Sequence, residues 1–185
     1  MDGFKVFVGV EVTTIEDLDI IIIGERDHVR NLRDQSEMIK GNKMNIGLKA
    51  LMDLCDPINS LIIIAHPYRD YDVFPKISKT LIKKFDAIEL NAIDLQNKGE
   101  QQTKENVHKL SKELKLPIVC GSDSHHSIQS GSVKNKFSNK CLTIKDLKQQ
   151  IKLGNFSIEL SPALRVRVKC GAMIKRILHP KVRML

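Results

Sequence analysis

The stretch Pro117-Ile-Val-Cys-Gly-Ser-Asp-Ser-His-His126 begins as a short apolar run and continues through a glycine into an acid and two histidines. The apolar run, residues 118–120, predicts a buried strand. Asp123 and His125 are two residues apart, so their side chains point the same way in extended backbone, whereas His126 points to the other side. We therefore predict a strand whose carboxyl end presents an acid and a histidine together.

Apolar runs of the same kind recur along the chain and alternate with segments of helical spacing. We predict strands at 5–12, 18–24, 60–65, 86–90, 117–120 and 156–160, helices at 42–55, 75–84, 98–114 and 143–153, and a polar loop at 134–140. Continuous apolar strands separated by helices are typical of a parallel sheet that is covered on both faces. The predicted fold class is therefore α/β.

Composition limits the class of protein further. The chain has 185 residues, of which 42% are hydrophobic, enough for one domain with a sizeable core. The apolar runs are too short to cross a bilayer, and no secretory signal is visible at the start of the chain. The four cysteines are scattered without a C-x-x-C pair, which indicates reduced thiols. We expect a cytoplasmic protein without a membrane span.

The net charge of +8 is concentrated at the end of the chain, because seven Lys or Arg and no acid follow Leu160. We therefore divide the chain into a nearly neutral domain, 1–160, and a basic tail, 161–185. The tail is predicted to be either an edge strand, in which Arg165, Arg167 and Lys169 alternate with valines, or a packed helix. Its apolar stripe as a helix would be Leu164, Val168, Ala172 and Met173. Either form could offer a surface to nucleic acid or anionic lipid.

Acids and histidines recur where the predicted strands end, which is where sites collect in parallel α/β folds. They are Glu11, then Glu25, Asp27 and His28, then His66 and Arg69, then Glu89 and Asn91, and last Asp123 and His125. Each alone has an ordinary interpretation as a surface residue, a helix cap or a hydrogen-bonded turn residue. Together, nitrogen and carboxylate donors of this kind bind zinc, iron or manganese, and paired metals typically serve phosphoester hydrolysis.

Four motifs in this order resemble the PHP (polymerase and histidinol phosphatase) family over roughly residues 4–155. They are G-V-E-V-T-T at 9–14, I-I-I-A-H-P-Y-R at 62–69, A-I-E-L-N at 87–91 and V-C-G-S-D-S-H at 119–125. The resemblance implies a distorted, TIM-like (β/α)₇ barrel with two or three divalent metal ions at its carboxyl face. The metals would be zinc, manganese, iron or magnesium. The activity implied is phosphoester hydrolysis, with a phosphorylated small molecule, a nucleotide or nucleic acid as substrate.

The resemblance also implies roles for individual residues. Glu11 matches the glutamate that bridges two metals, His66 matches the His-Pro ligand, and Asp123 and His125 match the Asp-x-His ligand pair. For a further histidine ligand, His28 is the nearest candidate.

Three other residues have roles beside these ligands. Glu25 lies closer to its predicted strand than His28 and is the alternative to it. Arg69 and Asn91 are expected at the mouth of the site as substrate-binding residues. A surface salt bridge is an equal alternative for Arg69.

The family opens with a strand ending in H-x-H and a second ending in T-D-H, and no histidine precedes Glu11 here. We therefore expect a partial barrel that lacks the first strands, which would leave open sheet edges. The chain could be a fragment, it could be completed by a partner chain or swapped element, or it could have kept the scaffold and lost catalysis. The retained ligands favour the first explanation. The alternative function is a non-catalytic remnant, or a nucleic-acid-binding module that uses the basic tail.

Overall fold

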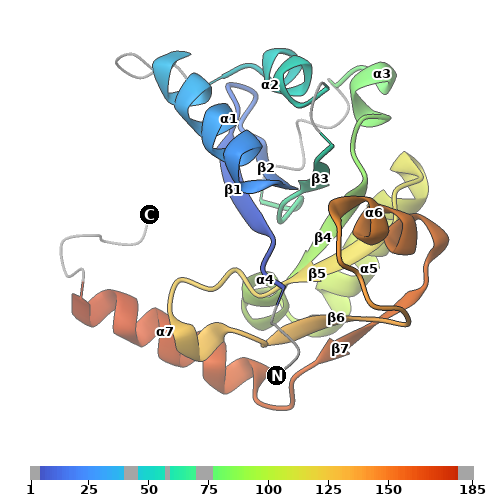
Figure 1. Ribbon diagram of the computed structural model, residues 1–185. Helices are drawn as coiled ribbons and strands as arrows, with labels where there is room; N and C mark the ends of the chain where they lie inside the picture. Colours follow the sequence, from blue (N-terminus) through green and yellow to red (C-terminus); the bar gives the residue numbers. More distant parts are fainter. Residues whose placement is uncertain (1–4, 40–45, 57–58, 70–76, 179–185) are drawn as a thin grey trace.

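The computed structural model describes residues 5–39, 46–56, 59–69 and 77–178, with the backbone alone at 36–39 (Figure 1). The elements in chain order are β1 (Val8–Thr13), β2 (Asp19–Gly24), α1 (Arg26–Ile39), α2 (Leu48–Cys55), β3 (Leu61–Ile64), α3 (Lys79–Ile82), β4 (Ala87–Asn91), α4 (Ala92–Asn97), α5 (Glu100–Leu114), β5 (Ile118–Gly121), the 3-10 helix η2 (Ser127–Gln129), β6 (Val133–Phe137), α6 (Ile144–Leu153), β7 (Phe156–Leu160) and α7 (Leu164–Leu178). No helix in these ranges is long and apolar enough to cross a membrane.

The main sheet has five strands in the order β1-β2-β3-β4-β5. β3, β4 and β5 are parallel, whereas β2 is antiparallel to both β1 and β3. The prediction of a parallel sheet is therefore wrong for β2, because the connection between β1 and β2 is a tight turn in which Asp17 has a φ of 60°. Parallel strands need a long crossover, whereas antiparallel neighbours can be joined by a turn of this length.

The sheet is buried on both faces, as the apolar strands predict. Ile62 and Ile64 of β3 face one core with Leu51 of α2 and Leu110 of α5. Leu61 and Ile63 face the other core, which is covered by Ile144 and Ile151 of α6. Each buried aliphatic side chain contributes about 1.5–3 kcal/mol to the burial free energy. The central strands are therefore a rigid base for the residues that follow them.

A second, two-stranded antiparallel sheet is formed by β6 and β7. The predicted loop at 134–140 is wrong over 134–137, which belong to β6, because Asn135 and Phe137 of this polar stretch are half-buried. Phe137 stacks on Phe156 with ring centroids 5.3 Å apart, and Asn135 exchanges hydrogen bonds of 2.9 and 2.8 Å with the backbone of Cys120 on β5. In the described ranges the strands form an open sheet and a ribbon, so the α/β class is confirmed and the (β/α)₇ barrel stays a prediction.

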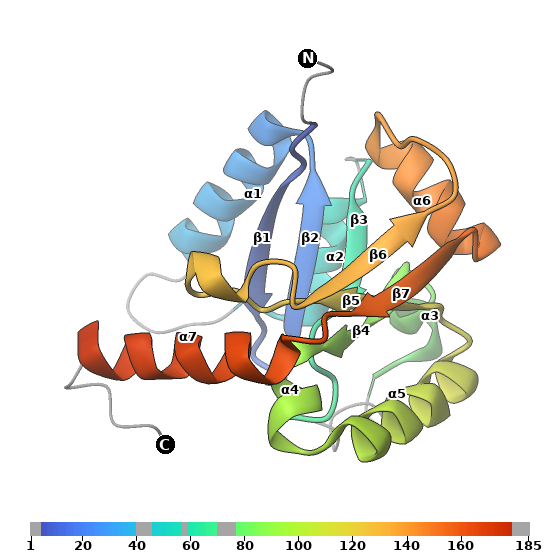
Figure 2. The ribbon, with the colours of Figure 1, turned by 90° about the horizontal axis from the view of Figure 1, so that it is seen from below.

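The helices differ from prediction in several places. α1 and α4 were not predicted, and α3 is shorter than the predicted 75–84. The predicted starts at 42–45 and 75–76 lie outside the described residues. The helical alternative for the basic tail holds over α7, which packs against α4 and η2 (Figure 2). Its buried side is Leu164, Val168 and Gly171, whereas Ala172 and Met173 of the predicted stripe are exposed.

Candidate metal centre

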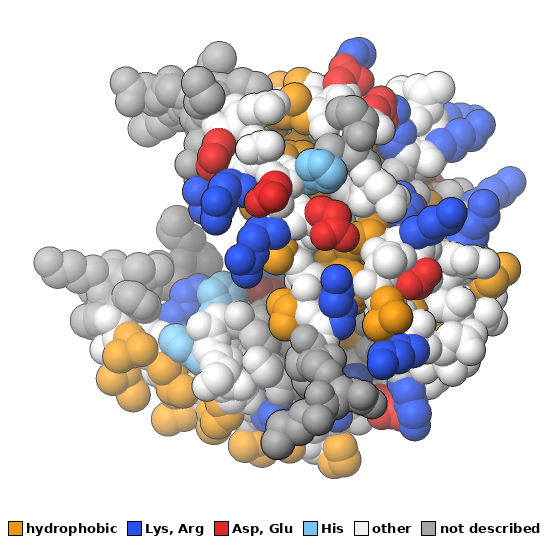
Figure 3. All heavy atoms as spheres, in the orientation of Figure 1, with side chains coloured by type: hydrophobic (Ala, Val, Ile, Leu, Met, Phe, Trp, Pro, Cys, Tyr) orange, Lys and Arg blue, Asp and Glu red, His pale blue; other side chains and the backbone are white. Residues whose placement is uncertain are grey.

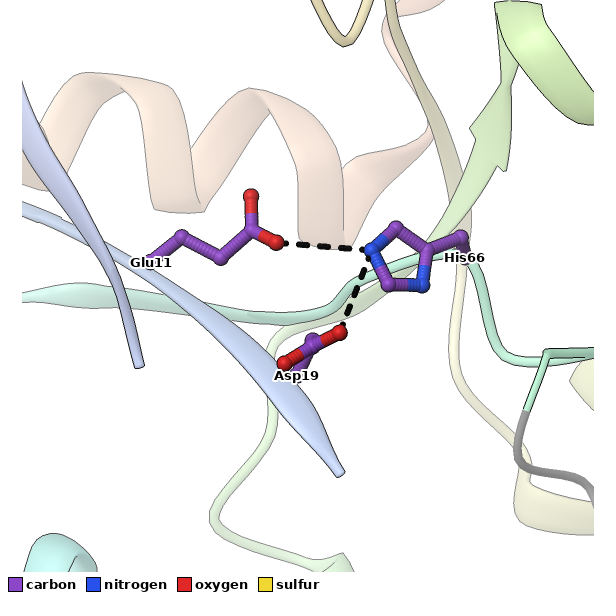
Figure 4. A group of neighbouring side chains, drawn as sticks. All are labelled: Glu11, Asp19 and His66. Carbon is purple, nitrogen blue, oxygen red and sulfur yellow. Dashed lines mark hydrogen bonds and ion pairs between the residues drawn. The ribbon is translucent and has the colours of Figure 1, made fainter. Parts of the chain in front are cut away.

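Three side chains converge at the carboxyl end of β3: Glu11 from β1, Asp19 from the start of β2, and His66 directly after β3 (Figure 4). The Nε2 atom of His66 lies 3.4 Å from Glu11 Oε1 and 3.4 Å from Asp19 Oδ2. One ligand atom from each of the three lies within 4.8 Å of the others. Donor atoms about 2.1 Å from a tetrahedral ion are roughly 3.4 Å apart. The cluster thus has the spacing and donor types of a divalent metal site.

Asp19 was not among the predicted ligands, because β2 was expected to run parallel to β1. In the hairpin, Asp19 pairs with Thr13, so the amino end of β2 lies at the carboxyl end of β1. Glu11 and Thr13 share one face of β1, and Asp19 is on the same face of the pair. The shortness of the connection between the two strands was the signal that could have identified Asp19.

His66 is held at a structural cost. Its side chain is 4% exposed, its backbone φ is 23°, and its buried Nδ1 atom has no hydrogen-bond partner within the described ranges. Left-handed backbone at a residue other than glycine, and a buried unpaired polar atom, each cost about 1–3 kcal/mol. Burial lowers the pKa of His66, but the bond to Glu11 and other nearby carboxylates outweigh it, so the pKa is raised. Such features cluster at functional sites.

Glu89 holds the backbone of His66 through a hydrogen bond. Its carboxylate is 3% exposed, and it accepts hydrogen bonds from the His66 backbone N–H at 2.9 Å and from Asn91 Nδ2 at 3.1 Å. Burial raises the pKa of this carboxyl group. A Cβ atom on Gly121 would lie 1.8 Å from Glu89 Oε1, so the glycine of the G-S-D-S-H motif leaves room for the carboxylate. Sequence reasoning placed Glu89 at a strand end without identifying this supporting role.

Asp123 and His125 lie in an adjoining cluster and not in direct contact with the first. Asp123 Oδ2 accepts from Arg69 at 2.9 Å and from Asn91 Nδ2 at 3.1 Å, and its φ is 48°. Burial raises the pKa of Asp123, but these two hydrogen bonds outweigh it and hold the pKa below its usual value. His125 Nδ1 is 3.5 Å from Asp123 Oδ1. Asn91 bridges the clusters, because it donates to both Glu89 and Asp123.

Arg69 forms the salt bridge that was the alternative to substrate binding. Its Nε donates to Asp94 Oδ1 at 3.1 Å, and its terminal nitrogen donates to Asp123 and, at 3.2 Å, to Asn91. The guanidinium group therefore neutralises two carboxylates next to the metal cluster. The ligand roles of Asp123 and His125, and the substrate-binding roles of Arg69 and Asn91, stay predictions.

His28 is not brought to this site. It is exposed on α1, beyond the carboxyl end of β2, and Gly24 at that end pairs with Val8 at the start of β1. Because β2 runs antiparallel to β1 and β3, the carboxyl end of β2 lies at the opposite end of the strands from His66. The expected convergence therefore fails for His28, and also for Glu25 and Asp27, which are exposed at the same end.

Cys120 is an unreactive thiol beside these clusters. It is buried in β5, and burial raises its pKa to about 12. A thiol with this pKa stays protonated near neutrality in the metal-free protein.

A pocket of about 490 Å³ opens beside the second cluster, between α4, η2 and α7. Arg69, Asp123 and His125 line this pocket, and its remaining charged lining residues are Asp94, Lys98, Lys169 and Lys175. The basic helix at the end of the chain is therefore one wall of a pocket next to the candidate metal centre. Sequence reasoning treated that helix as a separate tail, because its neighbours α4 and η2 are distant in the sequence.

No family model matches the sequence, and no curated protein sequence matches it. Among solved structures, PsfC from Pseudomonas syringae PB-5123 is similar with a TM-score of 0.68 and 16% identity, over 92% of this chain and 65% of PsfC. The lesion-specific endonuclease PfuEndoQ from Pyrococcus furiosus is similar with a TM-score of 0.53 and 18% identity, over 82% of this chain and 40% of the endonuclease. The chain thus spans less than two thirds of either protein, and the likeness is one of fold.

Proposed function

We propose that this chain carries a divalent metal site of the PHP type and contributes to hydrolysis of a phosphoester. The observation that carries the proposal is the 3.4 Å spacing of His66 Nε2 from both Glu11 Oε1 and Asp19 Oδ2. Two carboxylates and an imidazole are a donor set that suits zinc, manganese or iron. When bound, the metal would supply Lewis-acid activation of water and of the phosphoryl group.

The residues of the chain would hold this site in one geometry. Glu11 and Asp19 provide negative charge on one side of the ion position, and His66 provides its Nε2 atom on the other. Glu89 holds the His66 backbone through a 2.9 Å hydrogen bond, so the imidazole would not have to reorganise when the ion binds.

The adjoining cluster would form the substrate side of the same site. Asp123 and His125 are proposed to ligate a second ion or to orient the scissile phosphate, with Arg69 and Asn91 holding Asp123 in place. Arg69 could contact phosphate once Asp123 is engaged elsewhere. β1 has no strand paired on its outer edge in the described ranges, and a partner chain bound there would add further ligands.

Metal binding tests the proposal directly. The chain is stripped with a chelator, and Mn²⁺ or Zn²⁺ is titrated by calorimetry, with metal content measured by elemental analysis. We expect binding by the native chain and a loss of roughly 10–100-fold or more in affinity for Asp19→Asn. Asp27→Asn makes the same change at the opposite end of the sheet and should bind as the native chain does. If the native chain binds neither ion, the proposal is wrong.

Hydrolysis is measured on the same preparations with a chromogenic phosphomonoester and phosphodiester. We expect release of the chromophore that depends on added metal and that Asp19→Asn abolishes. Metal binding without hydrolysis of either ester would favour a non-catalytic PHP-like scaffold over an enzyme.

A further inference from the structure

The pocket between α4, η2 and α7 has a composition that indicates its ligand. Its volume of about 490 Å³ is in the range of small-molecule sites. Its lining includes Asp123 and His125, so a molecule bound there would contact residues of the proposed phosphoester site. The inference that follows rests on the proposed function and asks which substrate that site accepts.

The pocket has an excess of positive charge that the chain itself does not neutralise. Its two acids, Asp94 and Asp123, are both paired with Arg69. Lys98 donates to the Tyr68 carbonyl oxygen at 3.0 Å and forms an ion pair with Asp94 at 3.6 Å. Lys169 and Lys175 of α7 make no hydrogen bond or ion pair with the residues that the structure describes. Two cations next to a phosphate-processing site, without acidic partners, favour an anionic group on the ligand.

The rest of the lining combines apolar side chains with the amides of Gln96, Asn97 and Gln129. Ile93 of α4 and Val168 and Ala172 of α7 line the pocket beside the lysines. A ligand that fits this lining has an apolar face, such as that of a nucleobase, and polar groups for the amides, together with its charge. Inorganic phosphate alone would leave this part of the wall without a contact.

The position of α7 relative to the site is fixed by close packing. A Cβ atom on Gly171 would lie 2.2 Å from Cδ of Gln129, so the helix can approach η2 only with glycine there. Gln129 Oε1 in turn accepts from the His125 backbone N–H at 3.1 Å. Arg167 donates to the Ser130 carbonyl oxygen at 2.9 Å. The lysines of α7 are therefore held at a set distance from the Asp123–His125 segment.

We propose that this is a leaving-group pocket, and that the preferred substrate is a phosphoester whose leaving group carries a second phosphate, bound by Lys169 and Lys175. The pocket volume suits one nucleotide-sized unit. The second phosphate could belong to a small molecule or to the next unit of a nucleic acid strand, and the two sources share the same contact chemistry.

The test compares two double variants of the same helix with the same loss of charge. Lys169→Ala/Lys175→Ala removes the two pocket cations, whereas Arg165→Ala/Arg176→Ala removes two exposed cations that do not line the pocket. Binding of adenosine 3′,5′-bisphosphate and of inorganic phosphate is measured by calorimetry on metal-free protein, so the result does not depend on hydrolysis. Circular dichroism and the thermal midpoint confirm that both variants fold.

We expect the bisphosphate to bind the native chain more tightly than inorganic phosphate does. The lysine variant should lose roughly tenfold or more in affinity, and the arginine variant roughly twofold or less. In hydrolysis, the lysine variant should raise KM for a bisphosphorylated ester by roughly tenfold or more, whereas the arginine variant should leave that KM within about twofold of the native value. Equal losses in the two variants, or no bisphosphate binding by the native chain, would overturn the proposal. Bisphosphate binding that depends on the lysines, in a chain without metal binding, would retain the pocket and reject the hydrolase.

A third measurement identifies the source of the second phosphate. A short single-stranded oligonucleotide is titrated under the same conditions at two salt concentrations. Affinity that exceeds the bisphosphate by tenfold or more, and that needs Lys169 and Lys175, assigns the pocket to nucleic acid. Equal or weaker affinity assigns it to a small phosphorylated molecule. Tight oligonucleotide binding that only the arginine variant loses would overturn the proposal in favour of a nucleic-acid surface on the outer side of α7.

Discussion

The two ends of the five-stranded sheet differ in the kind of charge that they collect. At one end, Glu11, Asp19 and His66 meet beside the Asp123 cluster. At the other end, a larger hollow of about 750 Å³ is lined by Lys83, Lys115, Lys145, Lys148 and Lys152. Figure 3 shows Lys and Arg side chains gathered on the side of the molecule where α6 lies. Cavity size and charge alone would therefore select the lysine-lined end.

The backbone and the hydrogen bonds separate the two ends. Positive φ occurs at His66, the first residue of a turn closed by the Arg69 N–H at 3.0 Å, and at Asp123, and neither residue caps a helix. At the lysine-lined end, the positive φ of Lys115 is the ordinary C-cap of α5. Lys148 is paired with Asp86 at 3.1 Å and with the Ser60 carbonyl oxygen at 2.7 Å, which ties α6 to the sheet. Acids that converge at a structural cost are thus a better sign of a site than an open basic hollow.

The largest effect is expected from Gly121→Ala, which places a Cβ atom against the buried Glu89 carboxylate. Overpacking of this kind should lower the free energy of unfolding by at least about 3 kcal/mol and weaken metal binding, because Glu89 holds the His66 backbone. Gly47→Ala is the matched control, since its φ is −69° and its nearest contact would be 3.4 Å away. Urea unfolding measures both variants, and equal stability would show that Glu89 has room to move.

Asn91→Ala should have the next largest effect, because this side chain caps a helix and also donates a hydrogen bond to each of two carboxylates. Asn91 caps α4 by accepting from the Ile93 N–H at 2.8 Å, and it separates the carboxylates of Glu89 and Asp123. Loss of the cap and of two charge-assisted hydrogen bonds should cost about 2 kcal/mol or more in unfolding free energy. Asn139→Ala removes an exposed amide as the control, and a comparable loss there would show that the cost is unrelated to the site.

The pH dependence of the metal-free protein should report on His66. The pKa of His66 is raised in the folded protein, so protonated His66 stabilises the fold. This stabilisation is fully present below the unfolded pKa of about 6.5 and is lost as pH rises through the folded pKa. The thermal midpoint of chelator-treated protein should therefore fall as pH rises through that range, and His66→Asn should make the midpoint less dependent on pH. Metal affinity should change the opposite way, since the ion competes with the proton. His108→Asn, on α5, should leave the native curve unaltered.

The smallest effect is expected at the lysine-lined end. Lys145→Ala/Lys152→Ala should leave metal affinity and hydrolysis within about twofold of the native chain, because neither residue contacts the carboxyl end of the sheet. Calorimetry and the chromogenic assay measure both quantities. A loss of tenfold or more in the rate of hydrolysis would show that part of the substrate site lies at the lysine-lined end.

Prediction from sequence succeeded where a local pattern carries the information. The run 61–64 is apolar throughout, so burial on both faces of the sheet could be read directly. Prediction failed for β6, where polar residues alternate with half-buried ones, and for α1, a strongly polar helix. In both cases other elements of the fold supply apolar contacts, and the local sequence of the strand or helix does not reveal them.

The apolar runs of the sequence were enough to place Glu11 and His66 near the carboxyl ends of two strands, and so to predict that they lie near each other. The place of Asp19 in the cluster depends on the fold, because a tight turn reverses β2 and brings its amino end to the carboxyl ends of β1 and β3. The same reversal removes His28 from the site. Only the tertiary structure placed Lys169 and Lys175 beside Asp123, because the fit of Gly171 against Gln129 is a contact between residues far apart in the chain.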